Sequence, residues 1–160
     1  MKIPEGLMRF ILVVVIFLAC LVHVTALSTD AMEEGSRKLA GPHAVDCGRV
    51  GIDKNPKSAT DCALSAFNAG KPFRVRYDLQ GIDSSVAAGF VLTPGGKLYG
   101  MSFDGDPMGG GGVSKERQRF TTIACPKPVH VSVTKSGRLN CFPPSKSKGD
   151  IMSPTFSPYE

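Results

Sequence analysis

Residues 55–79 read NPKSATDCALSAFNAGKPFRVRYDL, and they decide the fold class because a helix pattern is followed directly by a strand pattern. Asn55 is a favoured N-cap, and Pro56 is tolerated at the first helical position because its missing N–H has no partner there. Gly70 suits the left-handed residue that closes a helix. Apolar side chains between them recur at the spacing of one buried helix face, at Ala59, Cys62, Ala63, Ala66 and Phe67. The pattern predicts a helix over residues 56–69.

Strand patterns fill the chain after this helix. Residues 73–78 alternate between apolar and charged side chains, which predicts a half-buried strand with a polar side made of Arg74, Arg76 and Asp78. Residues 86–93 and 97–103 are two further strands, joined by the turn formers Pro94-Gly95-Gly96. A fourth strand is expected over about residues 117–125.

A final hairpin follows, and its register can be predicted from the side chains that need burial. A three-residue loop over residues 135–137 places Val133 opposite Leu139. The same register places Val131 opposite Cys141, so that the apolar residues share one face. Together these patterns predict an α+β fold, with one N-terminal helix packed on an antiparallel β-sheet of four to six strands.

The N-terminus has the pattern of a secretory signal peptide. Lys2 and Arg9 lead into an apolar run, and small residues precede a cleavage position after Ala26. An uncleaved membrane anchor is an alternative, because the run spans about seventeen residues, the lower limit for crossing a bilayer. His23 interrupts that run. Bacterial lipidation at Cys20 is a second alternative, although this cysteine lies deep inside the apolar segment.

The cysteines support export of the chain. Removal of the signal takes away Cys20 and leaves an even number, Cys47, Cys62, Cys125 and Cys141. An even set in a short exported chain is typical of a disulfide framework. Cys62 lies on the buried helix face, and Cys47 comes from the segment that leads into this helix. Cys141 points inward from the last strand, and Cys125 ends the strand just before the final hairpin. We therefore predict the pairs Cys47–Cys62 and Cys125–Cys141.

Composition divides the rest of the chain into segments. Residues 1–26 are the predicted signal peptide, and residues 27–45 lack a sustained periodicity and are expected to be a flexible spacer. The predicted α+β domain spans residues 46–142. Residues 143–160 are rich in Pro, Ser and Lys, which predicts a disordered tail.

Charge and motifs exclude several functions. Without the signal peptide, 17 Lys and Arg stand against 13 Asp and Glu, a net charge of +4 that is scattered along the chain. Nucleic-acid binding needs a clustered basic face, so no nucleic-acid partner is expected. No P-loop or Gly-x-Ser-x-Gly motif is present, and only His43 and His130 remain in the mature chain. A membrane contact is expected only through an uncleaved signal or a lipid anchor.

The most unusual stretch is the glycine-rich loop that begins with Phe103 and ends with four glycines at 109–112. Asp104 and Asp106 stand at alternate positions, as oxygen ligands for calcium do in such loops, although the EF-hand spacing is absent. A mobile hairpin loop that closes on a partner is the other interpretation. That partner loop is formed by Asp104, Gly105, Asp106, Pro107, Met108 and Gly109.

Two functional classes follow from these features. The first is a non-catalytic binding or inhibitor-like module, secreted or periplasmic, whose partner is another protein or an envelope component. It predicts that replacing Asp104 and Asp106 by alanine weakens partner capture while folding stays intact. The alternative is a small secreted hydrolase that uses carboxylates such as Asp78, Asp83 and Asp104, with calcium as an assisting ion. No other cofactor is expected.

Overall fold

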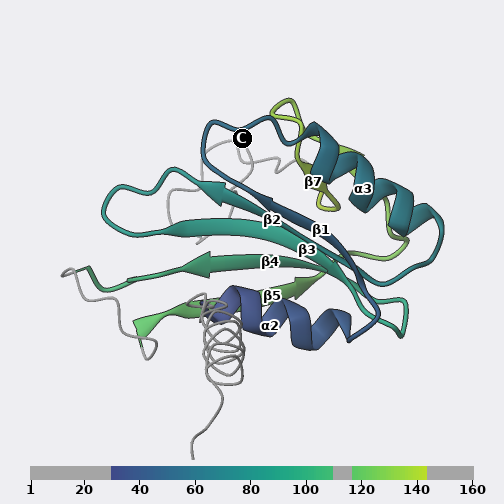
Figure 1. Cartoon of the computed structure of the whole chain (residues 1–160), viewed down its shortest axis with the longest axis horizontal. Coiled ribbons are helices and arrows are strands. Elements are labelled where there is room, and N and C mark those ends of the chain that lie inside the picture. The colour runs from purple at the N-terminus through teal and green to yellow at the C-terminus, as the bar shows by residue number, and fades with distance from the viewer. Residues whose placement is uncertain (1–29, 110–116, 144–160) are drawn as a thin grey trace, which may run out of the picture.

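The computed structural model describes residues 30–109 and 117–143 (Figure 1). The predicted signal peptide, residues 144–160 of the predicted tail and residues 110–116 of the glycine-rich loop lie outside the described residues. The helices and longer strands are α2 (Ala31–Ala40), β1 (Val45–Val50), α3 (Lys57–Asn68), β2 (Phe73–Leu79), β3 (Val86–Leu92), β4 (Leu98–Asp104) and β5 (Arg119–Ala124). A short hairpin follows, made of β6 (Ser132–Val133) and β7 (Leu139–Asn140).

The sheet is mixed, whereas the sequence predicts a purely antiparallel one. Its strand order is β1-β2-β3-β4-β5, and β2 to β5 form an antiparallel meander. β1 pairs with β2 in parallel, because α3 connects the two strands and a helical crossover returns the chain in its original direction. The α+β class with five strands within the sheet is confirmed.

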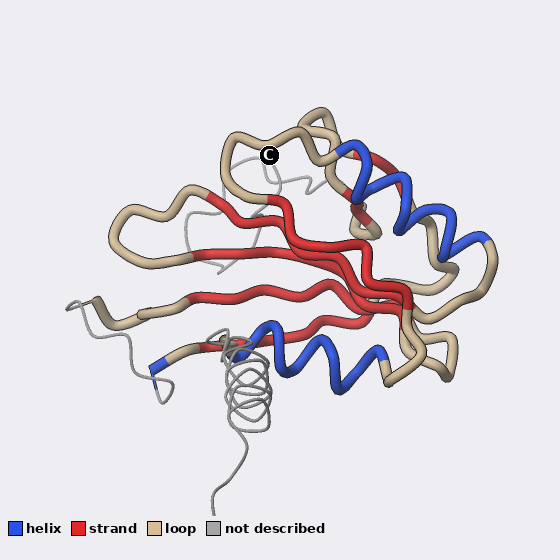
Figure 2. The backbone as a smooth tube through the Cα atoms, in the orientation of Figure 1, coloured by secondary structure: helices blue, strands red, loops and turns tan. Residues whose placement is uncertain are grey.

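The predicted helix 56–69 is confirmed as α3, but it is not the first element of the domain, since α2 and β1 precede it. α3 and the β6–β7 hairpin cover one face of the sheet, here called the α3 face (Figure 2). The core on this face includes Ala63, Phe73, Tyr77, Phe90 and Leu139, all at most 1% exposed. These side chains come from the helix, the sheet and the hairpin alike, so three elements share one core.

Part of the expected flexible spacer is a helix, which corrects that prediction. Asp30 caps α2, because its carboxylate accepts a hydrogen bond from the Glu33 backbone N–H at 2.9 Å. Met32, Ser36 and Ala40 recur every four residues and are buried against the opposite face of the sheet, here called the α2 face. The folded part of the chain therefore includes Asp30 and α2, upstream of the predicted boundary at residue 46.

α2 approaches the sheet closely over Gly89 of β3. A Cβ at Gly89 would lie 2.2 Å from the Val75 carbonyl oxygen and 3.0 Å from the Met32 methyl group. Since real Cβ atoms do not come within 2.2 Å of a non-bonded atom, the Val75 carbonyl oxygen requires glycine here, and the Met32 side chain packs closely over it. The core on this face also includes Val91, Met101 and Phe103.

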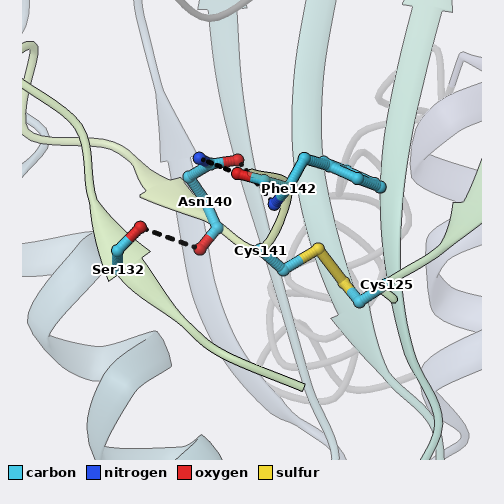
Figure 3. Close-up of a disulfide and its surroundings, with 5 residues drawn as sticks. All are labelled: Cys125, Ser132, Asn140, Cys141 and Phe142. Atoms are coloured by element: carbon cyan, nitrogen blue, oxygen red, sulfur yellow. Dashed lines mark hydrogen bonds between the residues drawn. A yellow bond between two sulfur atoms is a disulfide. The ribbon is translucent and has the colours of Figure 1, made fainter. Parts of the chain in front are cut away.

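Both predicted disulfides are present, and both secure elements to the α3 face. Cys47–Cys62 joins β1 to α3, and Cys125–Cys141 joins the end of β5 to the end of the β6–β7 hairpin (Figure 3). Two disulfides suggest an oxidising, extracellular environment. Within residues 30–109 and 117–143, neither helix is long and apolar enough to cross a membrane.

The predicted register of the hairpin is confirmed, with Val133 opposite Leu139. The Thr134 backbone N–H donates to the Arg138 carbonyl at 2.8 Å, which closes the three-residue loop. Leu139 is fully buried, but Val133 is 49% exposed. Val133 therefore shares a face of the hairpin with Leu139, as its register requires, but it is only half covered.

Candidate functional site

Three loops meet at one end of the sheet, on the left of Figure 1. β1 and β2 are parallel, and the meander brings the β4–β5 connection to the same end as the β2–β3 connection. The described parts of these loops are residues 51–56, 80–85 and 105–109. We call this surface the loop end.

The loops following β2 and β4 are hydrogen-bonded to each other. The Ser84 hydroxyl donates to Asp104 Oδ1 at 2.8 Å, and the Gly105 backbone N–H donates to the Ser85 carbonyl at 2.8 Å. Asp104 Oδ1 also accepts from the Asp106 N–H at 3.1 Å. These bonds hold the two loops in a fixed relative position.

Asp104 and Asp106, predicted as metal ligands and partner residues, thus help to build the loop. Asp106 is only 8% exposed, so its side chain is not available to a partner. Replacing Asp104 by alanine would remove the carboxylate that accepts hydrogen bonds from Ser84 and from the Asp106 N–H, so this substitution would alter the loop itself as well as any contact with a partner. Of the predicted partner loop, Pro107 and Met108 are exposed to solvent, and the Met108 side chain is 87% exposed.

The calcium hypothesis rests on the sequence pattern alone. Among the described residues, no group of three or more His, Cys, Asp or Glu side chains gathers where it could hold a metal ion. The Asp83 carboxylate also lies beside this loop, with Oδ2 at 3.4 Å from the position that a Cβ of Gly109 would take. Calcium prefers six to eight oxygen ligands, which these side chains do not supply together.

A hollow of about 440 Å³ opens beside the loop end, between the end of β1 and the β2–β3 loop. It is lined by Arg49, Ile52, Arg76, Asp78 and residues 79–86. Two guanidinium groups share one carboxylate within this lining. Arg49 Nε donates to Asp78 Oδ2 at 2.6 Å, and Arg76 Nε donates to Asp78 Oδ1 at 2.9 Å. The hydrogen bond to Asp78 is the main cause that raises the pKa of Arg49.

Arg76 belongs to a network of ion pairs that fixes α2 to β2. Its Nη1 atom lies 2.7 and 2.6 Å from the two carboxylate oxygens of Asp30, and its guanidinium stacks on Phe103 at 5.3 Å. Arg74, two residues earlier on the same strand, pairs with Glu33 of α2 at 2.6 Å and with Asp46 of β1. The polar side of this strand is therefore largely covered by helix α2.

Catalytic geometry is not seen among the described residues. Both oxygens of Asp78 already accept hydrogen bonds from arginines, and the four cysteines are bonded in pairs. His130 is exposed on the hairpin. Burial raises the pKa of Tyr77, whose hydroxyl lies 2.9 Å from Thr60 Oγ1 inside the core of the α3 face. One side-chain hydroxyl, that of Ser84, donates to a carboxylate, but this bond to Asp104 Oδ1 joins the two loops to each other.

The loop end carries three large exposed apolar side chains, of which the sequence analysis included Met108 in a candidate site but missed Ile52 and Ile82. Ile82 is 105% exposed relative to a free residue, Met108 is 87% exposed and Ile52 is 43% exposed. Ile52 and Ile82 both line the hollow, and Met108 belongs to the loop that is bonded to Ser84. Each stands between turn formers, in Gly51-Ile52-Asp53, Gly81-Ile82-Asp83 and Pro107-Met108-Gly109. An apolar residue inside a turn motif is the signal that could have revealed them.

A second hollow, of about 610 Å³, lies at the far end of α2. Its lining includes Arg37, Lys38 and Arg74, together with Asp46. Arg37 and Arg74 both pair with Glu33, so their charges are already balanced within the fold. No large exposed apolar side chain lies in this lining, which makes the loop end the better candidate site.

No family model, curated protein or solved structure matches this chain. The function of the loop end must therefore follow from its own geometry and chemistry.

Proposed function

We propose that the protein is an exported, non-catalytic binding module that engages another protein through the loop end. One observation carries this proposal: Ile52, Ile82 and Met108 are exposed together on neighbouring loops of one sheet end. Burying a large aliphatic side chain contributes about 1.5–3 kcal/mol of favourable free energy. The isolated molecule does not gain this free energy in full at these three positions. Large apolar side chains exposed on neighbouring loops of one surface are typical of interaction sites.

The surroundings of these side chains suit a protein partner. Arg49, whose side chain is 59% exposed, and the exposed Asp83 form a polar rim next to the apolar centre. The lining of the hollow contains two arginines and two aspartates, so it has no excess positive charge that would favour nucleic acid. The hydrogen bonds among Ser84, Ser85, Asp104 and Gly105 hold the loops in place, which lowers the entropy cost of binding.

Export is the other half of the proposal. It is supported by the signal pattern of residues 1–26 and by the two disulfides, which persist in oxidising compartments. The hydrolase alternative has no specific observation in its favour, since Asp78 and Asp104 each accept hydrogen bonds that fix the fold.

The proposal can be tested with a photo-reactive residue placed at Asp83, in extracellular fluid from the protein's own source. We expect a discrete cross-linked product that excess unlabelled protein competes away. A double variant, Ile82→Ser with Met108→Ser, should compete at least tenfold less well, because about 1.4 kcal/mol of lost binding corresponds to a tenfold change in affinity.

The control is Val133→Ser, which removes an apolar side chain that is 49% exposed on the β6–β7 hairpin, outside the three loops of the loop end. It should compete as well as the unaltered protein. Equal competition by the double variant, or no product that unlabelled protein displaces, would contradict the proposal.

A further inference from the structure

β5 forms an outer edge of the sheet with its backbone open. Within residues 30–109 and 117–143, no strand pairs with its outer side, and every residue of β5 except the half-buried Phe120 is exposed. The strand Arg119–Ala124 reads RFTTIA and contains no proline. Its register against β4 runs without interruption over all six residues. An unprotected edge of this kind is a template for a further strand.

The hydrogen-bonding groups of this edge can be assigned to individual residues. The Cys125 backbone N–H donates to the Leu98 carbonyl at 3.0 Å, so Cys125 faces β4. Bonded and non-bonded positions alternate in an antiparallel ladder, which turns the N–H and C=O groups of Ile123 and Thr121 toward β4 as well. The groups of Phe120, Thr122 and Ala124 therefore point outward.

The opposite edge of the sheet is built differently. The register of β1 is interrupted by a bulge between Asp46 and Arg49, where Gly48 has a φ of 86°. Asp46 Oδ1 accepts a hydrogen bond from the Gly48 N–H at 3.0 Å, and this occupies a backbone donor of the bulge. A bulge and charged side chains are the usual protection of an edge strand against pairing. β5 has neither, apart from the single charge of Arg119 at its start.

We propose that β5 pairs with β5 of a second copy of this chain, antiparallel and centred on Thr122. This surface is separate from the loop end, so the inference does not rest on the proposed function. In this register Thr122 lies opposite itself, Phe120 opposite Ala124, and Thr121 opposite Ile123. The large Phe120 side chain thus lies opposite the small Ala124, and Thr121 lies opposite the aliphatic Ile123. These pairs make the strand complementary to itself.

Charge also permits this pairing. Arg119 lies opposite Cys125 rather than opposite its own copy, because the twofold axis passes through Thr122. At about 3.4 Å per residue the two Arg119 positions are roughly 20 Å apart, beyond the screening length of about 8 Å at physiological salt. The axis is perpendicular to the sheet, so the two α2 helices lie on the same face, one on each side of the seam.

Sedimentation equilibrium of the full-chain protein as exported tests this inference. We expect a reversible dimer whose dissociation constant rises at least tenfold in Thr122→Glu and in Thr122→Lys, because each variant places two like charges directly opposite each other. An equimolar mixture of the two variants should dimerise again, since Glu then faces Lys. This rescue requires that position 122 lies opposite position 122.

The control is Ser58→Glu, which adds the same charge at an exposed position of α3. It should dimerise like the unaltered protein, and urea denaturation should show that both position-122 variants remain folded. An unaltered protein that stays monomeric, single variants that dimerise normally, or a mixture that remains monomeric would each overturn the proposal.

Discussion

At the scale of single residues, Arg76 connects more parts of the molecule than its sequence position suggests. It is 6% exposed and contacts the α2 cap Asp30, the hollow residue Asp78 and the ring of Phe103. Arg49 shares the same Asp78 partner, but its side chain is 59% exposed. Both arginines form an ion pair with Asp78, but Arg76 is buried and Arg49 is exposed. Comparing their substitutions therefore separates the effect of burial on stability from the effect of ion pairing.

We expect Arg76→Ala to lower the free energy of unfolding by about 3 kcal/mol, because it leaves two carboxylates without their buried partner. Arg49→Ala is the matched change and should cost less than about 1 kcal/mol, since exposed pairs are screened by water. Urea denaturation midpoints at neutral pH measure both values. Equal losses for the two variants would show that burial of Arg76 does not matter.

At the scale of elements, the sequence predicted the parts whose signals are local. α3 has a start signal, one buried face and a stop signal, and each strand of the meander lies between turn formers. The pairing of the cysteines followed from the same local geometry. These features need no knowledge of distant residues, which is why they could be predicted.

The elements that were missed depend on distant partners. α2 is ten residues long, has Gly35 at its centre and a largely polar sequence, so its own propensity is weak. The Asp30-x-x-Glu33 spacing of a capping box was visible. The helix is stabilised by ion pairs with Arg74 and Arg76, forty or more residues away. In the same way, β1 is a short, glycine-containing strand whose parallel pairing depends on the α3 crossover.

Prediction of the candidate site was limited in the same way, because the sequence shows local patterns but not contacts between distant residues. Asp104 and Asp106 drew attention by their spacing, but only the fold shows that Asp104 holds the β2–β3 loop through Ser84. Ile82 and Met108 are separated by 26 positions, and their loops come together only because β3 and β4 pair in register. A sequence can mark an apolar residue in a turn, but it cannot show which turns are neighbours.

The close contact between α2 and β3 predicts a specific cost at Gly89. Gly89→Ala should destabilise the protein by about 1–3 kcal/mol, because the new Cβ would meet the Val75 carbonyl and the Met32 side chain. Gly51→Ala is the control, since the nearest atom there is a flexible Lys54 carbon at 3.6 Å. It should be neutral or stabilise by about 0.4–1 kcal/mol.

Thermal unfolding followed by circular dichroism compares the two alanine variants. A Gly89→Ala protein as stable as Gly51→Ala would mean that the β2 backbone at Val75 and the Met32 side chain can both shift away from the new Cβ at no cost.

At the scale of the whole molecule, the two faces of the sheet are held by different interactions. Both disulfides secure the α3 face, and each closes a loop worth about 3 kcal/mol in the chain-entropy model. α2 is held to the other face by apolar packing and by the ion pairs of Arg74 and Arg76, with no cysteine involved. A reducing agent therefore acts directly on one layer only.

We expect limited reduction to release α3 and the β6–β7 hairpin before α2. Hydrogen exchange measured by mass spectrometry, with and without dithiothreitol, should show earlier loss of protection in Lys57–Asn68 than in Ala31–Ala40. Loss of protection in both helices at the same rate would show that the two layers unfold as one cooperative unit.

The difference between the two sheet edges also limits the size of any assembly. A molecule with two open edges could add copies indefinitely, and such growth leads to fibres. Here the bulged, charged edge of β1 cannot accept β5, so pairing of one β5 with another uses the open edge of both copies at once. The assembly closes at two, and its mass should reach a plateau with rising concentration instead of increasing without limit. The molecule can thus keep an open strand at β5 without the risk of polymerisation, provided that the bulge at Gly48 is retained.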